Sequence, residues 1–184
     1  MSLVLWFTAL LFLAAGQEPT EGRILRPTDG AALPSGETSI IAAAPGGKLE
    51  IDGKPLAAEE SAPGVFRAKV TLPAGAHTLA LSWQGGRKQI RFFVGSDPPG
   101  EFKPFQLHPP VQVECTQCHG LSRRGRFVFK GGCFDCHQET AFAKTHQHTP
   151  EVLESCGRCH SPHGSTEKFL LMFPREKACK LCHN

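Results

Sequence analysis

The pattern Cys-x-x-Cys-His occurs four times within the last 70 residues of this 184-residue chain. The four copies are Cys115-Thr116-Gln117-Cys118-His119, Cys133-Phe134-Asp135-Cys136-His137, Cys156-Gly157-Arg158-Cys159-His160 and Cys179-Lys180-Leu181-Cys182-His183. Together they use all eight cysteines of the protein. The segment from His108 to His183 has only 76 residues in which to hold all four motifs, too few for a conventional apolar core.

The motif is the attachment signature of c-type haem. Two thiols add across the two vinyl groups of one haem, and the histidine that follows becomes the proximal iron ligand. We therefore predict four c-type haems, which themselves serve as the core of this segment. The attachment cysteines are Cys115, Cys118, Cys133, Cys136, Cys156, Cys159, Cys179 and Cys182. The proximal iron ligands are His119, His137, His160 and His183.

Two other uses of paired cysteines are open, namely disulfides and zinc sites. Eight cysteines would allow 105 disulfide connectivities, and repeated Cys-x-x-Cys units also occur in zinc ribbons. Neither use needs a histidine at one fixed offset. With nine histidines in 184 residues, chance would place one after all four pairs about once in 10⁵. The fixed histidine favours haem.

The N-terminus has the features of an export signal. Ser2 to Ala15 is an apolar run that ends in small residues, so residues 1–16 are predicted to be a signal peptide. The run is too short to span a bilayer, and the mature chain is expected to lack a transmembrane segment and to be periplasmic or extracellular. Lysines and arginines are scattered, and haem propionates would offset the formal charge of +3, so no nucleic-acid partner is expected.

Residues 23–95 contain no cysteine and predict a small all-β sandwich. The expected strands are Arg23–Arg26, Thr38–Ala43, Lys48–Ile51, Gly64–Leu72, His77–Trp83 and Lys88–Val94. Between Gly64 and Leu72, apolar residues alternate with polar ones, as in a strand with one buried face. His77 shares a face with Leu79 and Trp83, and we expect it to be a hydrogen-bonded structural histidine. The segment from Gly64 to Leu79 resembles bacterial immunoglobulin-like domains.

Residues 96–107, rich in proline and glycine, are predicted to be a linker, and residues 108–184 a haem domain with short helices and little regular structure. The haem region also looks duplicated. His108-Pro109-Pro110 precedes one motif pair and His148-Thr149-Pro150 the other. The second unit, with Cys159-His160-Ser161-Pro162-His163 and then Cys179, resembles the doubled CXXCH motif of bacterial multihaem cytochromes. The first unit departs from it, since Gly120-Leu121-Ser122 stands where Ser161-Pro162-His163 would be.

Four histidines of the haem region lie outside the motifs, one for each predicted iron: His108, His146, His148 and His163. This count predicts bis-histidine ligation of all four haems. His163 lies three residues from His160, a span of at most about 11 Å, so it should ligate a neighbouring haem. His146 and His148, two residues apart, should likewise serve different haems. Met172 lies in an apolar run and is expected to pack there.

Iron with two histidine ligands has no open position and a low potential compared with Met/His ligation. Electron transfer is therefore the predicted function, with periplasmic or outer-membrane redox proteins as partners. Two alternatives remain. The chain could be a structural subunit of an extracellular cytochrome assembly or filament, a homo-oligomer detectable by size exclusion. It could also be a haem enzyme with one open iron site, detectable by carbon monoxide binding.

Overall fold

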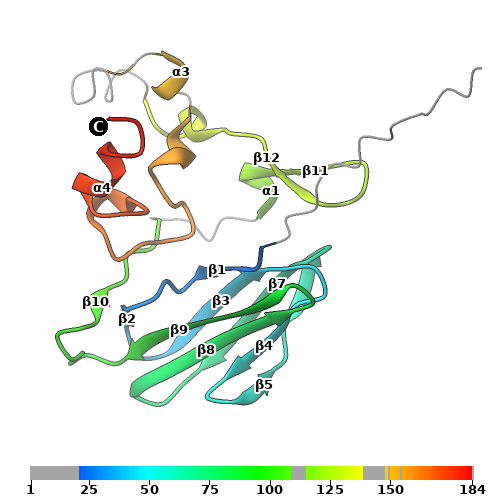
Figure 1. The fold of residues 1–184 in the computed structure, drawn as a ribbon, viewed down its shortest axis with the longest axis vertical. Helices are drawn as coiled ribbons and strands as arrows, with labels where there is room; N and C mark the ends of the chain where they lie inside the picture. The colour runs from blue at the N-terminus through cyan, green and yellow to red at the C-terminus, as the bar shows by residue number, and fades with distance from the viewer. Residues whose placement is uncertain (1–20, 109–114, 139–147, 149, 154, 184) are drawn as a thin grey trace, which may run out of the picture.

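The computed structural model describes residues 21–108, 115–138, 148, 150–153 and 155–183. The predicted signal peptide and the predicted ligand His146 lie outside the described residues. The chain forms a β-sandwich with a C-terminal region of short elements lying over one end of it (Figure 1). This arrangement confirms the predicted fold class.

The sandwich consists of two sheets. The four-stranded sheet has the order β1 (Arg23–Arg26), β3 (Glu37–Ala43), β7 (Val65–Thr71) and β6 (Glu59–Ala62). The six-stranded sheet has the order β10 (Lys103–Pro104), β2 (Ala31–Leu33), β9 (Gly86–Val94), β8 (Gly75–Trp83), β4 (Lys48–Ile51) and β5 (Lys54–Leu56). β2 pairs in parallel with both β9 and β10, and the other pairs are antiparallel.

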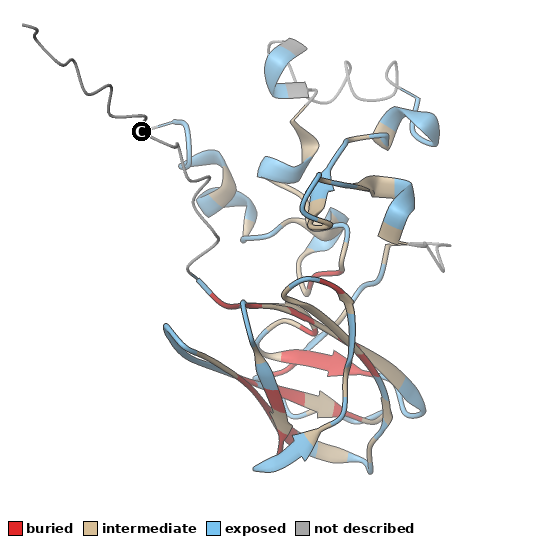
Figure 2. Ribbon diagram, turned by 90° about the vertical axis from the view of Figure 1, so that its right-hand side faces the viewer, coloured by how far each residue is buried: buried red, intermediate tan, exposed pale blue. Residues whose placement is uncertain are grey.

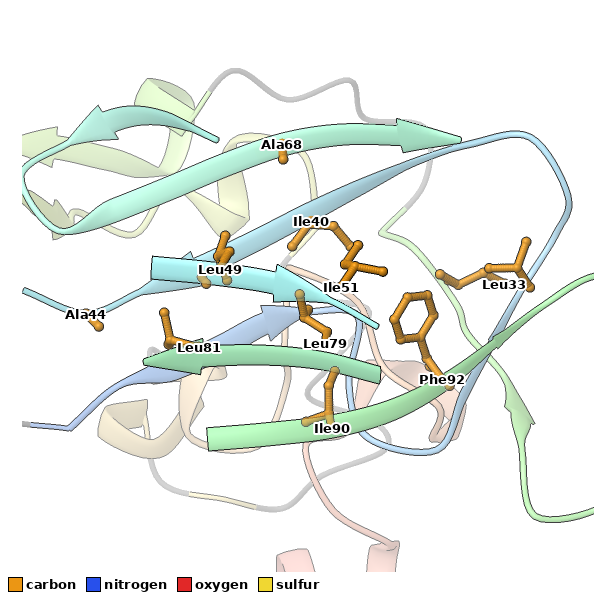
Figure 3. Packing of buried hydrophobic residues seen from close by; sticks show 13 residues of the cluster. Leu33, Ile40, Ala44, Leu49, Ile51, Ala68, Leu79, Leu81, Ile90 and Phe92 are labelled. Carbon is orange, nitrogen blue, oxygen red and sulfur yellow. The ribbon is translucent and has the colours of Figure 1, made fainter. Parts of the chain in front are cut away.

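Alternating apolar residues build the core between the two sheets. Leu79 and Leu81 of β8, Ile90 and Phe92 of β9, and Ile40 of β3 are all buried. Figure 3 shows these side chains pointing toward one another from the two layers. The predicted alternation in β7 is confirmed: Ala68 is buried, whereas Lys69 is exposed.

Four short strands escaped the sequence prediction: β2, β5, β6 and β10. Each has only two to four residues, too few for an alternating pattern to show. β10 falls within the predicted linker at 96–107. Phe102, beside it, is only 6% exposed, and Phe105 packs against the core. The end of this segment is therefore built into the sandwich and is not a free connector.

His77 is a structural histidine, as expected. It is 6% exposed. Its Nδ1 lies 2.8 Å from Asp52 Oδ2, and its Nε2 lies 2.9 Å from the carbonyl oxygen of Pro73. Both ring nitrogens are thus used within the sandwich.

Beyond residue 107 the described elements are short. They are α1 (Cys115–Cys118), β11 (His119–Leu121), β12 (Phe127–Phe129), η1 (Cys133–Asp135), α3 (Pro150–Leu153), η2 (Cys156–Arg158), η3 (Lys168–Leu170) and α4 (Arg175–Cys179). β11 and β12 pair as a two-stranded hairpin. Burial is concentrated in the sandwich, whereas the C-terminal region is almost entirely intermediate or exposed (Figure 2). None of the helices in the described part of the chain is long and apolar enough to cross a membrane.

Candidate haem-binding site

The Cys-x-x-Cys-His motifs adopt a common local structure, a single helical turn. The first forms α1, the second and third contain η1 and η2, and the fourth begins at the end of α4. In three of them the histidine N–H donates to the carbonyl of the first cysteine, at 2.9 Å for His137, 2.9 Å for His160 and 3.0 Å for His183. Positions i, i+3 and i+4 of such a turn share one face. The turn therefore presents both thiols and the imidazole on the same side.

The predicted duplication is visible in the backbone hydrogen bonds. After the first motif, β11 and β12 pair, and Lys130 N–H donates to Cys118 O at 3.0 Å. After the third motif, His160 bridges Leu171, and Met172 N–H donates to Cys159 O at 2.8 Å. Each unit thus turns back on the histidine of its first motif. In the first unit the turn is a hairpin whose residues 120–128 include no histidine.

A backbone carbonyl orients the imidazole of the motif histidine His160. Its Nδ1 lies 2.7 Å from the carbonyl oxygen of Phe169, so Nδ1 is the protonated donor and Nε2 keeps a lone pair for a metal. Phe169 and Leu170 have φ values of 60° and 57°, a left-handed conformation that is costly for such side chains. Strained backbone of this kind collects at functional sites.

Three imidazole pairs join a motif histidine to a histidine outside the motifs. His119 lies beside His163 with ring centroids 6.0 Å apart, His108 beside His137 at 5.7 Å, and His148 beside His183 at 6.2 Å. His163 therefore lies next to a motif other than its own neighbour His160, as the reach argument expects. Each of the three pairs brings together residues from different parts of the chain.

Three of these histidines have a lowered pKa. Burial, followed by the nearby His119 and Arg26, lowers the pKa of His163 to about 4. Burial lowers the pKa of His119, and burial and His137 lower that of His108. A lowered pKa keeps these imidazoles neutral at pH 7, which is the form that binds a metal. The Nδ1 atom of His119 is buried and has no hydrogen-bond partner within the described residues.

The apolar surface of the C-terminal region fits a large apolar ligand. The exposed large hydrophobic residues are Leu107, Leu121, Val128, Phe129, Phe134, Val152, Phe169, Met172, Phe173 and Leu181. All of them lie after the sandwich core, and Phe169 is 80% exposed. Met172, expected to pack within its apolar run, is 41% exposed in the polypeptide. Exposed apolar side chains are thus frequent among the described residues after 107, and the apolar porphyrin ring is a ligand of matching character.

The thiols are available for attachment. None of the eight cysteines, all of which lie in the described part of the chain, forms a disulfide. Burial, followed by the neighbouring Cys156 and Cys118, raises the pKa of the Cys133 thiol, and Cys133 hydrogen-bonds to Cys156. Thiols of the first three motifs therefore lie near one another. In the described ranges, His, Cys, Asp and Glu side chains do not gather in groups of three or more that could hold a metal ion by themselves.

Comparison with known proteins supports haem at the second unit. The family model of the doubled CXXCH motif matches residues 148–184. No curated protein matches the chain. The Cys-x-x-Cys-His motifs imply covalently bound c-type haem with its iron, and with it an electron-carrying role. Cytochromes of this type are typically exported.

Several solved structures share a likeness of fold. A polysaccharide lyase has a TM-score of 0.34 and 10% identity, and the match covers 42% of this chain and 12% of the lyase. Fibronectin(III)-like modules of CbhA from Clostridium thermocellum have a TM-score of 0.33 and 14% identity, and the match covers 41% of this chain and 96% of the module chain. A chain of the immunoglobulin complex of titin M10 and obscurin-like 1 has a TM-score of 0.28 and 22% identity, and the match covers 43% of this chain and 97% of that one.

The structure also shows contacts of the site that sequence reasoning missed. The Nε of Arg26 in β1 donates to the carbonyl oxygen of His163 at 2.9 Å. Gln106, from the predicted linker, pairs with Ser165. Neither residue belongs to a recognisable motif, and both are far in sequence from the loop that they contact: Arg26 is 137 residues from His163, and Gln106 is 59 residues from Ser165. The sequence carried no signal for these contacts.

Proposed function

We propose that this chain is an exported tetrahaem cytochrome that transfers electrons between redox partner proteins. Each of its four haems has two histidine ligands and a low potential. The eight motif cysteines hold the haems, and the four motif histidines are the proximal ligands. His108, His146, His148 and His163 are the distal ligands. The setting is the periplasm or the cell exterior.

The histidine pairs carry the proposal. Two imidazoles that held one iron at about 2.0 Å each would have neighbouring rings. The ring centroids of the three pairs are 5.7, 6.0 and 6.2 Å apart, close enough for each pair to hold one iron between them. The pairs support His163 as partner of His119, His108 as partner of His137, and His148 as partner of His183. His146 is the one spare histidine left after these three assignments, so we assign it to the iron held by His160.

The chain's residues suit electron transfer better than catalysis. Haem iron supplies reversible one-electron exchange between its ferric and ferrous states. Two strong imidazole ligands leave no position for substrate or oxygen. The carbonyl of Phe169 holds His160 in one tautomer, with Nε2 left for the iron. The closeness of Cys133 to Cys156 and Cys118 supports closely spaced haems.

The test is haem content and spin state of the protein made with a cytochrome c maturation system. Mass spectrometry is expected to show four haem masses added to the chain. Ferric spectra should be entirely low-spin, because two imidazoles give a strong ligand field, without a methionine-to-iron charge-transfer band. Met172→Leu, at the methionine next to the site, is the control and should leave the spectra unchanged.

Other outcomes point elsewhere. Bound zinc without haem would contradict the proposal outright. A high-spin fraction with carbon monoxide binding to the reduced protein would favour an enzyme with an open iron site. A large species whose size depends on concentration, seen by size exclusion, would favour a subunit of a filament or assembly.

A further inference from the structure

One loop of the haem region is fastened to the sandwich by backbone pairing. Gln106 N–H donates to Ser165 O at 2.8 Å, and Ser165 N–H donates back to Gln106 O at 3.0 Å. Ser165 is buried, only 4% exposed. The hydroxyl of Ser165 donates to Leu171 O, and Leu171 forms an isolated β-bridge with His160. Gln106 itself follows β10, the edge strand of the six-stranded sheet.

The residues just before Ser165 are held from the other sheet. Arg26 Nε of β1 donates to the carbonyl oxygen of His163 at 2.9 Å. Gly164 has φ of +117° and packs so closely that a Cβ there would clash with the Phe105 ring and come within 3.0 Å of Gln106 O. The Lys103–Glu167 ion pair at 3.0 Å has a mostly exposed lysine, so it contributes little. Backbone bonds and close packing therefore hold residues 163–165.

This fastening matters because of what His163 faces. The second unit carries residues 163–165, the histidine loop, after its first motif, and at the corresponding place the first unit forms the β11–β12 hairpin. The imidazole beside His119 therefore comes from the second unit, 44 residues further along the chain. A distant segment that becomes ordered only when its histidine binds iron loses conformational entropy at that step. A fold that already holds the segment in place removes this cost.

We infer that the β-sandwich is a positioning module for an axial ligand. It holds residues 163–165 so that His163 reaches the iron of the haem attached to Cys115 and Cys118. Arg26, Gln106 and Gly164 are the positioning residues, and none of them is itself a ligand. The inference rests on the proposed function, because it assumes that His119 and His163 ligate one iron.

Gly164→Ala is the first test. An alanine there would clash with Phe105 and adopt an unfavourable φ, so the loop should move away from the sandwich. Ferric spectra of the four-haem protein should then gain a high-spin component of about one quarter of the haem, assigned by NMR to the Cys115/Cys118 haem. Gly100→Ala is the matched control, because a Cβ at position 100 meets no atom within 4 Å.

Arg26→Met is the second test and involves no steric clash. It removes the donor to His163 O and the rest of the guanidinium while keeping an unbranched chain that reaches the position of Nε. A smaller fraction of the same haem should therefore lose His163 and become high-spin. Arg26→Lys, which restores a donor, should recover the low-spin spectrum in part. Arg23→Met, at an exposed position of the same strand, should have no effect. Added imidazole should return the opened haem to low spin in both defective variants.

The outcomes separate the inference from the proposed function. A wild-type protein without four low-spin haems would overturn the proposed function. If wild type behaves as proposed but Gly164→Ala and Arg26→Met leave every haem low-spin, the positioning role is refuted. A change confined to the Cys156/Cys159 haem would refute it as well, because His163 would then serve its own neighbour. A loss of thermal stability with unchanged haem spectra would make these contacts merely structural.

Discussion

At the scale of single residues, Asp52 shows how one side chain serves both a turn and the core. Asp52 and Gly53 form the two-residue loop between β4 and β5, with φ values of 51° and 74°. Asp-Gly is favoured where both loop residues need positive φ. The same carboxylate accepts a hydrogen bond from Thr78 N–H at 2.9 Å and contacts the buried His77 ring. The turn and the His77 contact therefore depend on one residue.

Asp52 also links stability to pH. Burial alone raises its pKa, but hydrogen bonds from His77 and Thr78 and the nearby charges lower the pKa overall. A folded-state pKa below the unfolded value adds stability above about pH 4, and this stability is lost as pH falls through the folded pKa. We expect Asp52→Asn to lower the free energy of unfolding by about 1 kcal/mol at pH 7. Asparagine is chosen because it tolerates positive φ.

Urea unfolding of residues 21–107, followed by Trp83 fluorescence, measures this difference. The gap between wild type and Asp52→Asn should narrow as the pH falls through the lowered pKa of the folded carboxyl, because the carboxyl is then protonated in both states. A gap that stays constant down to pH 2 would show that the charge of Asp52 contributes nothing.

At the scale of elements, β10 decides where the sandwich ends. It adds only two residues to the edge of β2. Its neighbours Phe102 and Phe105 nevertheless pack on the sandwich, with Phe105 against the core. Phe105 N–H also donates to Ala32 O at 2.8 Å. The folding unit thus extends about ten residues beyond the last long strand, and the histidine loop is fastened to this extension.

This extension can be tested with two fragments. Residues 21–107 should fold cooperatively without haem, whereas residues 21–95 should be less stable by about 3 kcal/mol, because Phe102 and Phe105 are lost from their packing. Urea midpoints read from Trp83 fluorescence give the comparison. Equal midpoints would mean that residues 96–107 act as a linker after all.

At the scale of the whole molecule, the two halves are stabilised by different means. Buried residues are concentrated in the sandwich, as the colouring in Figure 2 shows. Among the described residues after 107, only Gly164 and Ser165 are buried, and both lie in the loop fastened to the sandwich. The remaining short elements bury too little apolar surface to offset their loss of conformational entropy.

We therefore expect the protein made without haem maturation to fold only in its sandwich. Hydrogen exchange should show protected amides in β3, β7, β8 and β9, and rapid exchange throughout residues 115–183. The haem-loaded protein should gain protection at the motif turns, because ligand binding stabilises the state that binds it. Strong protection of residues 115–183 in the haem-free protein would contradict this interpretation.

Several features could be predicted from local pattern. Alternating residues in β7, β8 and β9 located the long strands, because a strand with one buried face leaves a period of two in the sequence. The Cys-x-x-Cys-His spacing predicted haem attachment, because that chemistry needs both thiols and the histidine on one turn, and the family model of the doubled CXXCH motif matches residues 148–184. The repeat in the haem region was also visible, and it reappears in the matching bonds of Lys130 and Met172.

Other features depended on contacts between distant residues, for which the sequence carries no period. The sequence supplied four spare histidines, but only the fold brought His163 beside His119 and His148 beside His183. The same holds for Arg26 at His163 and for Gln106 at Ser165. Local spacing determined what chemistry the chain can hold. Tertiary packing decided which histidines meet, because the partners come from segments that only folding brings together.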